Sequence, residues 1–252
     1  MRFRMGGCGP RGFEGIPAGL FAMGFGPRGW GGAMLLATLM TVGVSVCGFL
    51  AGGVIGTGVA AMKLSRSRVA RIVADAYTTV LRGVPDLLVI YLFYFGGSLA
   101  LTAVGRWFGA EGFIGLPAFA IGSLAIGVVS GAYQAEVLRG AYLALSRGEL
   151  EAARSVGMSR ALMFRRIVAP QVLRYAIPGL GNVWQLVLKE SALISVTGLV
   201  ELLRQSQIGS GSTRQPFTFF LTAAALYLLI TTVSTWAFQR AEDRAMRGVR
   251  RA

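Results

Sequence analysis

Residues Gly29–Met62, GWGGAMLLATLMTVGVSVCGFLAGGVIGTGVAAM, form a run of 34 residues without a single charged side chain. An α-helix rises about 1.5 Å per residue, so about 20 apolar residues cross the ~30 Å hydrocarbon core of a bilayer. Because no water reaches the backbone there, such a segment has to satisfy its hydrogen bonds internally as a helix. The run therefore predicts a transmembrane helix, and its length allows for tilt.

Four further segments resemble this run in apolar character. Three of them are uncharged over 19 to 25 residues, and they are Leu87–Gly105, Gly112–Ala135 and Gln215–Gln239. The fourth, from about Val172 to Val200, is weaker, because Arg174, Pro178, Lys189 and Glu190 interrupt it. With this segment included, the chain is predicted to be an all-α integral membrane protein with five transmembrane helices and its ends on opposite sides.

The distribution of charge supports the five-helix arrangement. The 252 residues are 54% hydrophobic and only 14% charged, whereas soluble domains average about 25% charged residues. A formal charge of +14 is also a property of nucleic-acid-binding proteins. However, in the five-helix arrangement 17 of the 25 lysine and arginine residues lie on one side of the membrane. They occupy loops 63–82 and 139–174 and the segment after residue 239. Cationic loops stay in the cytoplasm, so we predict a periplasmic N-terminus, a cytoplasmic C-terminus and no nucleic-acid partner.

The residues that most enzyme chemistries require are missing. The sequence has no His, its two cysteines are Cys8 and Cys47, and no pair of carboxylates before the C-terminal tail suggests a two-carboxylate metal site. Zinc clusters, disulfide frameworks and Ser-His-Asp or Cys-His catalysis are therefore excluded. We predict no catalytic residue, metal site or cofactor, and without a G-x-x-x-x-G-K-[ST] loop the chain does not hydrolyse ATP itself.

Three regions are predicted along the chain. Residues 1–28 form a Gly- and Arg-rich arm without a continuous apolar core or a small-residue cleavage site, so we expect a flexible segment and not a signal peptide. The transmembrane domain occupies residues 29–240, and residues 241–252 form a basic cytoplasmic tail. The arginines of the arm lie on the predicted periplasmic side, which has fewer cationic residues. The positive-inside pattern does not account for their presence there.

The longest cytoplasmic connection, residues 147–170, has the sequence RGELEAARSVGMSRALMFRRIVAP. At helical spacing, Leu150, Ala153, Gly157 and Ala161 fall near one face of a helix. Gly157 lowers helix propensity by about 1 kcal/mol relative to Ala, so either the helix ends there or something approaches its backbone closely. Periodicity alone favours an amphipathic surface helix.

The spacing of residues in this loop resembles the EAA motif of bacterial ABC import permeases, E-A-A-x3-G-x9-I-x-L-P. Six positions match it, namely Glu151, Ala152, Ala153, Gly157, Ile167 and Pro170. The sequence departs from the pattern once, with Ala169 in place of Leu. The resemblance implies that this loop forms a short coupling helix, which sits in a groove of a separate ATPase subunit. It also implies that the six residues couple this chain to that ATPase.

Other segments resemble the polar amino acid branch of the same family. They are GWGG at 29–32, LRGVPDLL at 81–88, GAYQAEVLRG at 131–140 and LKESALIS at 188–195. Within that branch, VTGLVELL at 196–203 and GSTRQPF at 211–217 most resemble the Q-type permease of histidine, arginine and opine importers. The resemblance implies the transmembrane domain of a type I ABC importer in the bacterial inner membrane. Its implied partners are a second permease subunit, identical or a sister chain, two cytoplasmic ATPase subunits and a periplasmic amino-acid-binding protein.

Seven residues are candidates for lining a substrate pathway, and they are Arg82, Pro85, Tyr133, Glu136, Lys189, Glu190 and Ser191. A charge at bilayer depth is costly unless it faces a cavity or a partner, so Lys189 and Glu190 either meet charged groups of the substrate or lie at the outer rim of a short span. Pro85 predicts a helix break, which either exposes backbone to the pathway or simply follows an interfacial helix at about residues 69–81. Glu136 belongs either to a surface ion pair or to a gate.

These features together predict the permease subunit of an ATP-driven importer for polar, and specifically basic, amino acids or opines, of the histidine, arginine, lysine and octopine type. Glutamine or glutamate is the alternative substrate class. The competing class of protein is a self-sufficient secondary carrier or channel. Such a protein needs no docking surface for an ATPase, so changes at Gly157 would leave its transport intact.

Overall fold

The structure, a computed structural model, describes residues 23–26, 29–107 and 117–246, and these contain no β-strand. The predicted arm at 1–28 lies outside the described residues apart from 23–26, and so does the last part of the predicted tail. The α-helices are α2 (Gly31–Leu64), α3 (Arg68–Gly83), α4 (Asp86–Tyr91), α5 (Gly97–Trp107), α6 (Ala118–Leu143), α7 (Arg147–Ser155), α8 (Arg160–Met163), α9 (Ala169–Glu190), α10 (Leu202–Thr213) and α11 (Pro216–Ala245). Two π-helices, η1 (Leu92–Gly96) and η2 (Phe164–Val168), and one 3₁₀-helix, η3 (Ser191–Thr197), connect some of them.

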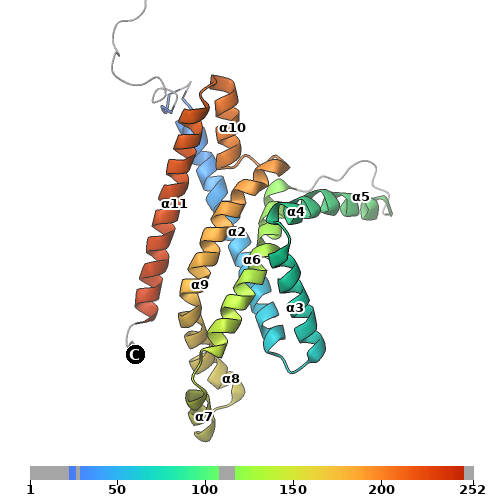
Figure 1. Cartoon of the computed structure of the whole chain (residues 1–252), viewed down its shortest axis with the longest axis vertical. Coiled ribbons are helices and arrows are strands. Elements are labelled where there is room, and N and C mark those ends of the chain that lie inside the picture. The colour runs from blue at the N-terminus through green and yellow to red at the C-terminus, as the bar shows by residue number, and fades with distance from the viewer. Residues whose placement is uncertain (1–22, 27–28, 108–116, 247–252) are drawn as a thin grey trace, which may run out of the picture.

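The long helices lie side by side in a bundle (Figure 1). Helices α2 and α6 cross at its centre, α9 packs on α6, and α11 packs on α9 and α10. Four segments are long and apolar enough to cross a membrane, namely α2, Asp86–Val104, α6 and α11. Helix α9 has 22 residues, which corresponds to about 33 Å, and lies among them as the fifth long helix. The all-helical membrane fold predicted from the sequence is confirmed.

The chain breaks between α3 and α4, as Pro85 predicts. Val84 is extended, with φ −93° and ψ 137°, because a proline ring disfavours helical geometry in the residue before it. Helix α3 packs against α2 and α6, and the interfacial position expected for residues 69–81 stays a prediction. Helix α5 extends sideways, away from the long helices (Figure 1).

Helices α2 and α6 approach each other through small residues. A Cβ atom at Gly48 would lie 2.7 Å from Cγ2 of Ile126, and one at Gly56 would lie 2.9 Å from Cβ of Gln134. The recurring glycines of α2 therefore allow close helix packing, as their spacing suggests. Gln134, which is 2% exposed, donates a hydrogen bond of 3.0 Å to the carbonyl oxygen of Phe49 and joins the two helices.

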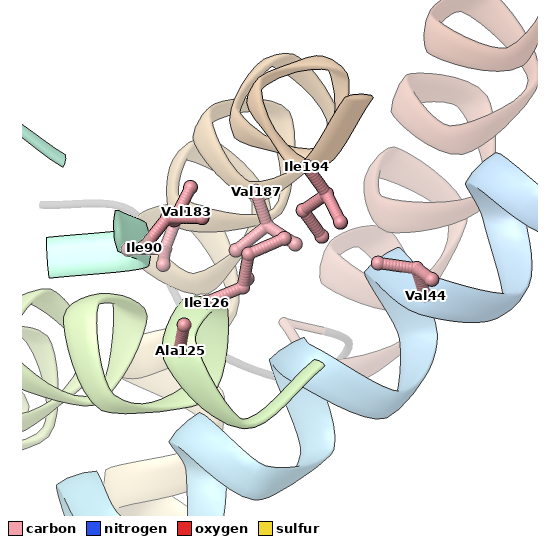
Figure 2. Packing of buried hydrophobic residues seen from close by; sticks show 7 residues of the cluster. All are labelled: Val44, Ile90, Ala125, Ile126, Val183, Val187 and Ile194. Carbon is pink, nitrogen blue, oxygen red and sulfur yellow. The ribbon is translucent and has the colours of Figure 1, made fainter. Parts of the chain in front are cut away.

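An apolar core joins α2, α4, α6 and α9 where they meet (Figure 2). It contains Val44, Ile90, Ala125, Ile126, Val183, Val187 and Ile194, all buried. Ile194 comes from the 3₁₀-helix η3 and points into this core with the side chains of the long helices. The end of α9 is therefore held against α4 and α6 by apolar packing.

A buried carboxylate fixes α10 to its neighbours. Glu201 accepts hydrogen bonds from the backbone N–H groups of Leu203 and Arg204, at 2.8 and 2.7 Å, and from the hydroxyl of Tyr227 in α11. Burial raises the pKa of the Glu201 carboxyl, and the three donors act in the opposite direction. The hydroxyl oxygen of Thr41 in α2 accepts a hydrogen bond of 3.1 Å from the backbone N–H of Leu202, the residue after Glu201. Helix α10 thus has polar contacts to both α2 and α11.

We expect Gly56→Leu to separate α2 from α6 and to destabilise the protein by about 1–3 kcal/mol, the range for overpacking a close contact. Gly58→Leu is the matched control, because a Cβ atom at exposed Gly58 meets nothing within 4 Å. Thermal unfolding of the purified variants in detergent measures the difference. Equal melting temperatures for the two variants would show that the α2–α6 contact does not depend on small residues.

Candidate functional site

Two acidic side chains meet where α4, α6 and α9 converge. Asp86 is the first residue of α4, and Glu190 is the last residue of α9 and is 4% exposed. The carboxyl group of Glu190 lies near that of Asp86, and neither of its oxygens has a hydrogen-bond partner among the described residues. Two neighbouring carboxylates, of which Glu190 is buried and Asp86 half-buried, repel each other unless they share a proton or bind a cation. This carboxyl pair is therefore a site suited to a cationic group.

Arg82 and Tyr133 lie beside the carboxyl pair. The guanidinium carbon of Arg82 is 5.4 Å from the centroid of the Tyr133 ring, which is the geometry of a cation–π contact. Tyr133 is also within electrostatic range of Asp86 and Glu190. One arginine and two carboxyl groups thus surround Tyr133 among the described residues, so acidic groups are in excess there.

A second group of charged side chains joins α2, α3 and α6. Lys63 near the end of α2 forms ion pairs with Asp75 of α3, at 2.8 Å, and with Glu136 of α6. Glu136 also pairs with Arg139, at 2.9 Å, as the i,i+3 spacing predicts. Glu136 is therefore more than a surface pair, because Lys63 connects it to two other helices.

One cavity of about 420 Å³ is lined by residues of both groups. Arg82 and Tyr133 line it together with Lys63, Thr78 and Glu136, whereas Asp86 and Glu190 are not among its lining residues. Three of the predicted pathway residues, Arg82, Tyr133 and Glu136, therefore line the same space. Its wall is polar and is formed by α2, α3 and α6.

The remaining pathway candidates have different positions. Lys189 is exposed and does not join the carboxyl pair, because neighbouring residues of a helix point about 100° apart. Ser191 is buried, and its hydroxyl donates to the carbonyl oxygen of Leu188 at 2.7 Å. Pro85 precedes α4 and positions Asp86 at the start of that helix.

Sequence reasoning missed three residues of these clusters, namely Lys63, Asp75 and Asp86. A local signal existed for Asp86, because an acidic residue directly after a helix-breaking proline lies at the N-terminus of the next helix. No local signal pairs Lys63 with Asp75 and Glu136, since that pairing depends on how three helices pack.

The segment at residues 147–170, which contains the EAA-like motif and is called the coupling loop below, begins with a short helix that ends before Gly157. Helix α7 stops at Ser155, and Gly157 has φ 76°, in the left-handed region that favours glycine. Its N–H donates to the carbonyl oxygen of Arg154, at 3.0 Å, and the N–H of Met158 donates to that of Ala153, at 3.1 Å, which is the Schellman motif. The expected shared face is therefore wrong: Gly157 and Ala161 do not continue the face that contains Ala153.

The EAA positions are distributed over several elements. Glu151 and Ala152 are exposed on α7, whereas Ala153 is 4% exposed. Ile167 lies in η2 and Pro170 in the first turn of α9. The side chains of Glu149 and Gln171 form a hydrogen bond that connects α7 to α9.

One family model and several known permeases match most of this chain in sequence. The family model described as "Binding-protein-dependent transport system inner membrane component" matches residues 48–248. The octopine transport system permease protein OccQ of Rhizobium radiobacter is 65% identical over 229 residues, which cover 91% of this chain and 97% of the relative. The histidine/lysine/arginine/ornithine transport system permease protein HisQ of Escherichia coli is 38% identical over 224 residues, covering 89% and 98%.

A solved structure shows the same fold. The crystal structure of an amino acid ABC transporter with histidines superimposes with a TM-score of 0.73 at 32% sequence identity, covering 85% of this chain and 95% of that chain. Sequence and fold thus agree over most of the length of both proteins. The chain therefore belongs to the inner membrane component family of binding-protein-dependent transport systems.

Proposed function

We propose that this chain is the permease subunit of an ATP-driven importer for basic amino acids or opines. The observation that carries the proposal is the buried carboxyl group of Glu190 beside the half-buried Asp86, with no cation in contact with Glu190 among the described residues. A guanidinium or ammonium group of the substrate would supply the missing positive charge. The names of the octopine and histidine/lysine/arginine/ornithine relatives support the same substrate class.

The cavity below the carboxyl pair provides the continuation of the pathway. A cationic substrate would move from Glu190 past Arg82 and Tyr133 toward Glu136, which is paired with Lys63. We place the Lys63 end at the cytoplasm and the N-terminus in the periplasm, because the arginine-rich loops are expected to remain on the cytoplasmic side. In this orientation the route leads into the cell.

Helix α7 is the proposed contact to the ATPase. It projects from the bundle at the end opposite α10 (Figure 1), and it carries the exposed Glu151 and Ala152 of the EAA motif. A second permease subunit and two ATPase subunits complete the proposed assembly, and a periplasmic binding protein delivers the solute. Nucleotide binding would move α7 and, through α9, the carboxyl pair.

Glu190→Gln tests the substrate site. Removing one charge from a buried site that binds a cation costs about 2–5 kcal/mol, so we expect the half-saturating concentration of arginine or octopine to rise at least tenfold. The measurement is solute-stimulated ATP hydrolysis by the reconstituted importer with arginine, histidine, lysine, octopine and glutamine. Asp86→Asn is expected to act in the same direction.

Lys189→Gln is the matched control, because Lys189 is adjacent in sequence but exposed. It is expected to leave the half-saturating concentrations unchanged. Stimulation by glutamine alone, with no response to any cationic solute, would contradict the proposal and favour the glutamine class.

Substitution of Gly157 tests the coupling loop. A β-branched residue disfavours φ 76°, and the left-handed conformation costs about 1–2 kcal/mol in non-glycine residues. We expect Gly157→Val to lower ATP-driven uptake at least fivefold and Gly157→Asn, which tolerates this φ, to retain most of it. Uptake into membrane vesicles with the ATPase present is the measurement.

The same pair of variants separates the two classes of transporter. A Cβ atom at Gly157 meets nothing within 4 Å in this chain, so folding of the bundle itself is not expected to suffer. Undiminished uptake by Gly157→Val that persists without an ATPase would establish a self-sufficient carrier or channel in place of an importer subunit.

A further inference from the structure

A second cavity lies at the end of the bundle that carries α7 and α8, apart from the proposed substrate route. It has a volume of about 450 Å³ and lies between the last turns of α2, the last turns of α6 and the η2–α9 junction. Ala61, Leu64, Leu138, Phe164 and Leu173 are among its lining residues, and none of its lining side chains is charged. We call this cavity the α2–η2 groove.

The α2–η2 groove opens on an exposed apolar strip of α2. Ala61 is exposed, and Val54, seven residues earlier on the same face, is 78% exposed. Phe164 and Leu173, on the opposite wall, are 60% and 57% exposed. Exposed apolar side chains at the end of a transmembrane bundle are covered by other apolar groups. A cavity of this size is likewise occupied, because protein and lipid pack closely. The lining fits alkyl groups.

Arginines adjoin the lining residues of the groove in the sequence. Arg165 and Arg166 are exposed on η2, between the lining residues Phe164 and Val168, and Arg174 directly follows Leu173. We call these three arginines the rim. The sequence contains no acidic residue between Glu151 and Glu190, so no carboxylate of this segment neutralises them. An apolar groove with arginines next to its lining residues matches a ligand that has an alkyl chain and a negatively charged head.

We propose that the α2–η2 groove binds one anionic glycerophospholipid, with an acyl chain in the groove and the phosphate head at Arg165 and Arg166. Basic pockets between the ends of transmembrane helices recognise anionic lipid heads through these two forces. The Tyr142 side chain, which also lines the groove, supplies an aromatic ring and a hydroxyl at its wall. This lipid site is independent of the proposed substrate and would exist in a permease for any solute.

Native mass spectrometry of the assembled permease complex tests the proposal. The full-length chain is purified with its partners in non-ionic detergent, delipidated, and titrated with dioleoylphosphatidylglycerol or dioleoylphosphatidylcholine. We expect the first phosphatidylglycerol to bind at least tenfold more tightly than phosphatidylcholine. Soluble glycerophosphoglycerol at equal concentration is expected not to displace it, because the head alone does not fill the groove.

Two variants separate the contributions of groove and rim. Ala61→Phe fills the groove from an exposed position and is expected to weaken phosphatidylglycerol binding at least fivefold, whereas Val54→Phe on the same strip of α2 leaves it unchanged. The double variant Arg165→Gln/Arg166→Gln is expected to reduce the affinity to the phosphatidylcholine level, and Arg244→Gln at the end of α11 is its control.

Three results would each overturn the proposal. They are equal binding of the two lipids, equal effects of the Ala61 and Val54 substitutions, and displacement of the lipid by the soluble head. Absence of lipid from the complex would likewise overturn it, since a partner chain would then cover the groove.

Discussion

The close contact between α2 and α6 is the constraint on which the rest of the structure depends. Between helices in a membrane there is little hydrophobic driving force, so association depends on close backbone approach and on polar contacts. Gly48 and Gly56 provide the first, and the hydrogen bond from Gln134 to Phe49 provides the second. Helices α3 and α9 then pack against the surface that α2 and α6 present, and this packing places the polar clusters along one side of α6.

The chain treats the polar groups of its helix bundle in three different ways. Gln134 hydrogen-bonds to a backbone carbonyl, and Lys63 neutralises Glu136 and Asp75. Glu190 lies near another carboxyl group, and its oxygens have no hydrogen-bond partner in the part of the chain that the structure describes. Uncompensated acidic groups at bilayer depth are expensive and are retained where they bind something. The carboxyl pair is therefore the part of the bundle whose structure is least explained by stability alone.

The coupling loop and the carboxyl pair are joined by one helical segment. The chain is helical without interruption from Arg160, three residues after Gly157, through η2 and α9 to Glu190. The Glu149–Gln171 hydrogen bond connects α7 to the first turns of this segment. A displacement of α7 would therefore be passed along this helical segment to the end that carries Glu190, which is a physical basis for the proposed coupling between the two sites.

The sequence by itself determined the helical membrane fold, the break at Pro85 and the spacing of the coupling motif, because apolar run length and the backbone restrictions of proline and glycine are local properties. It left open whether Gly157 ends a helix and which of Lys189 and Glu190 faces inward. Only the tertiary structure decided that Glu190 is buried against Asp86, and that Lys63 pairs with Glu136. These partners come from distant parts of the chain, and the direction of a side chain depends on the helices packed around it.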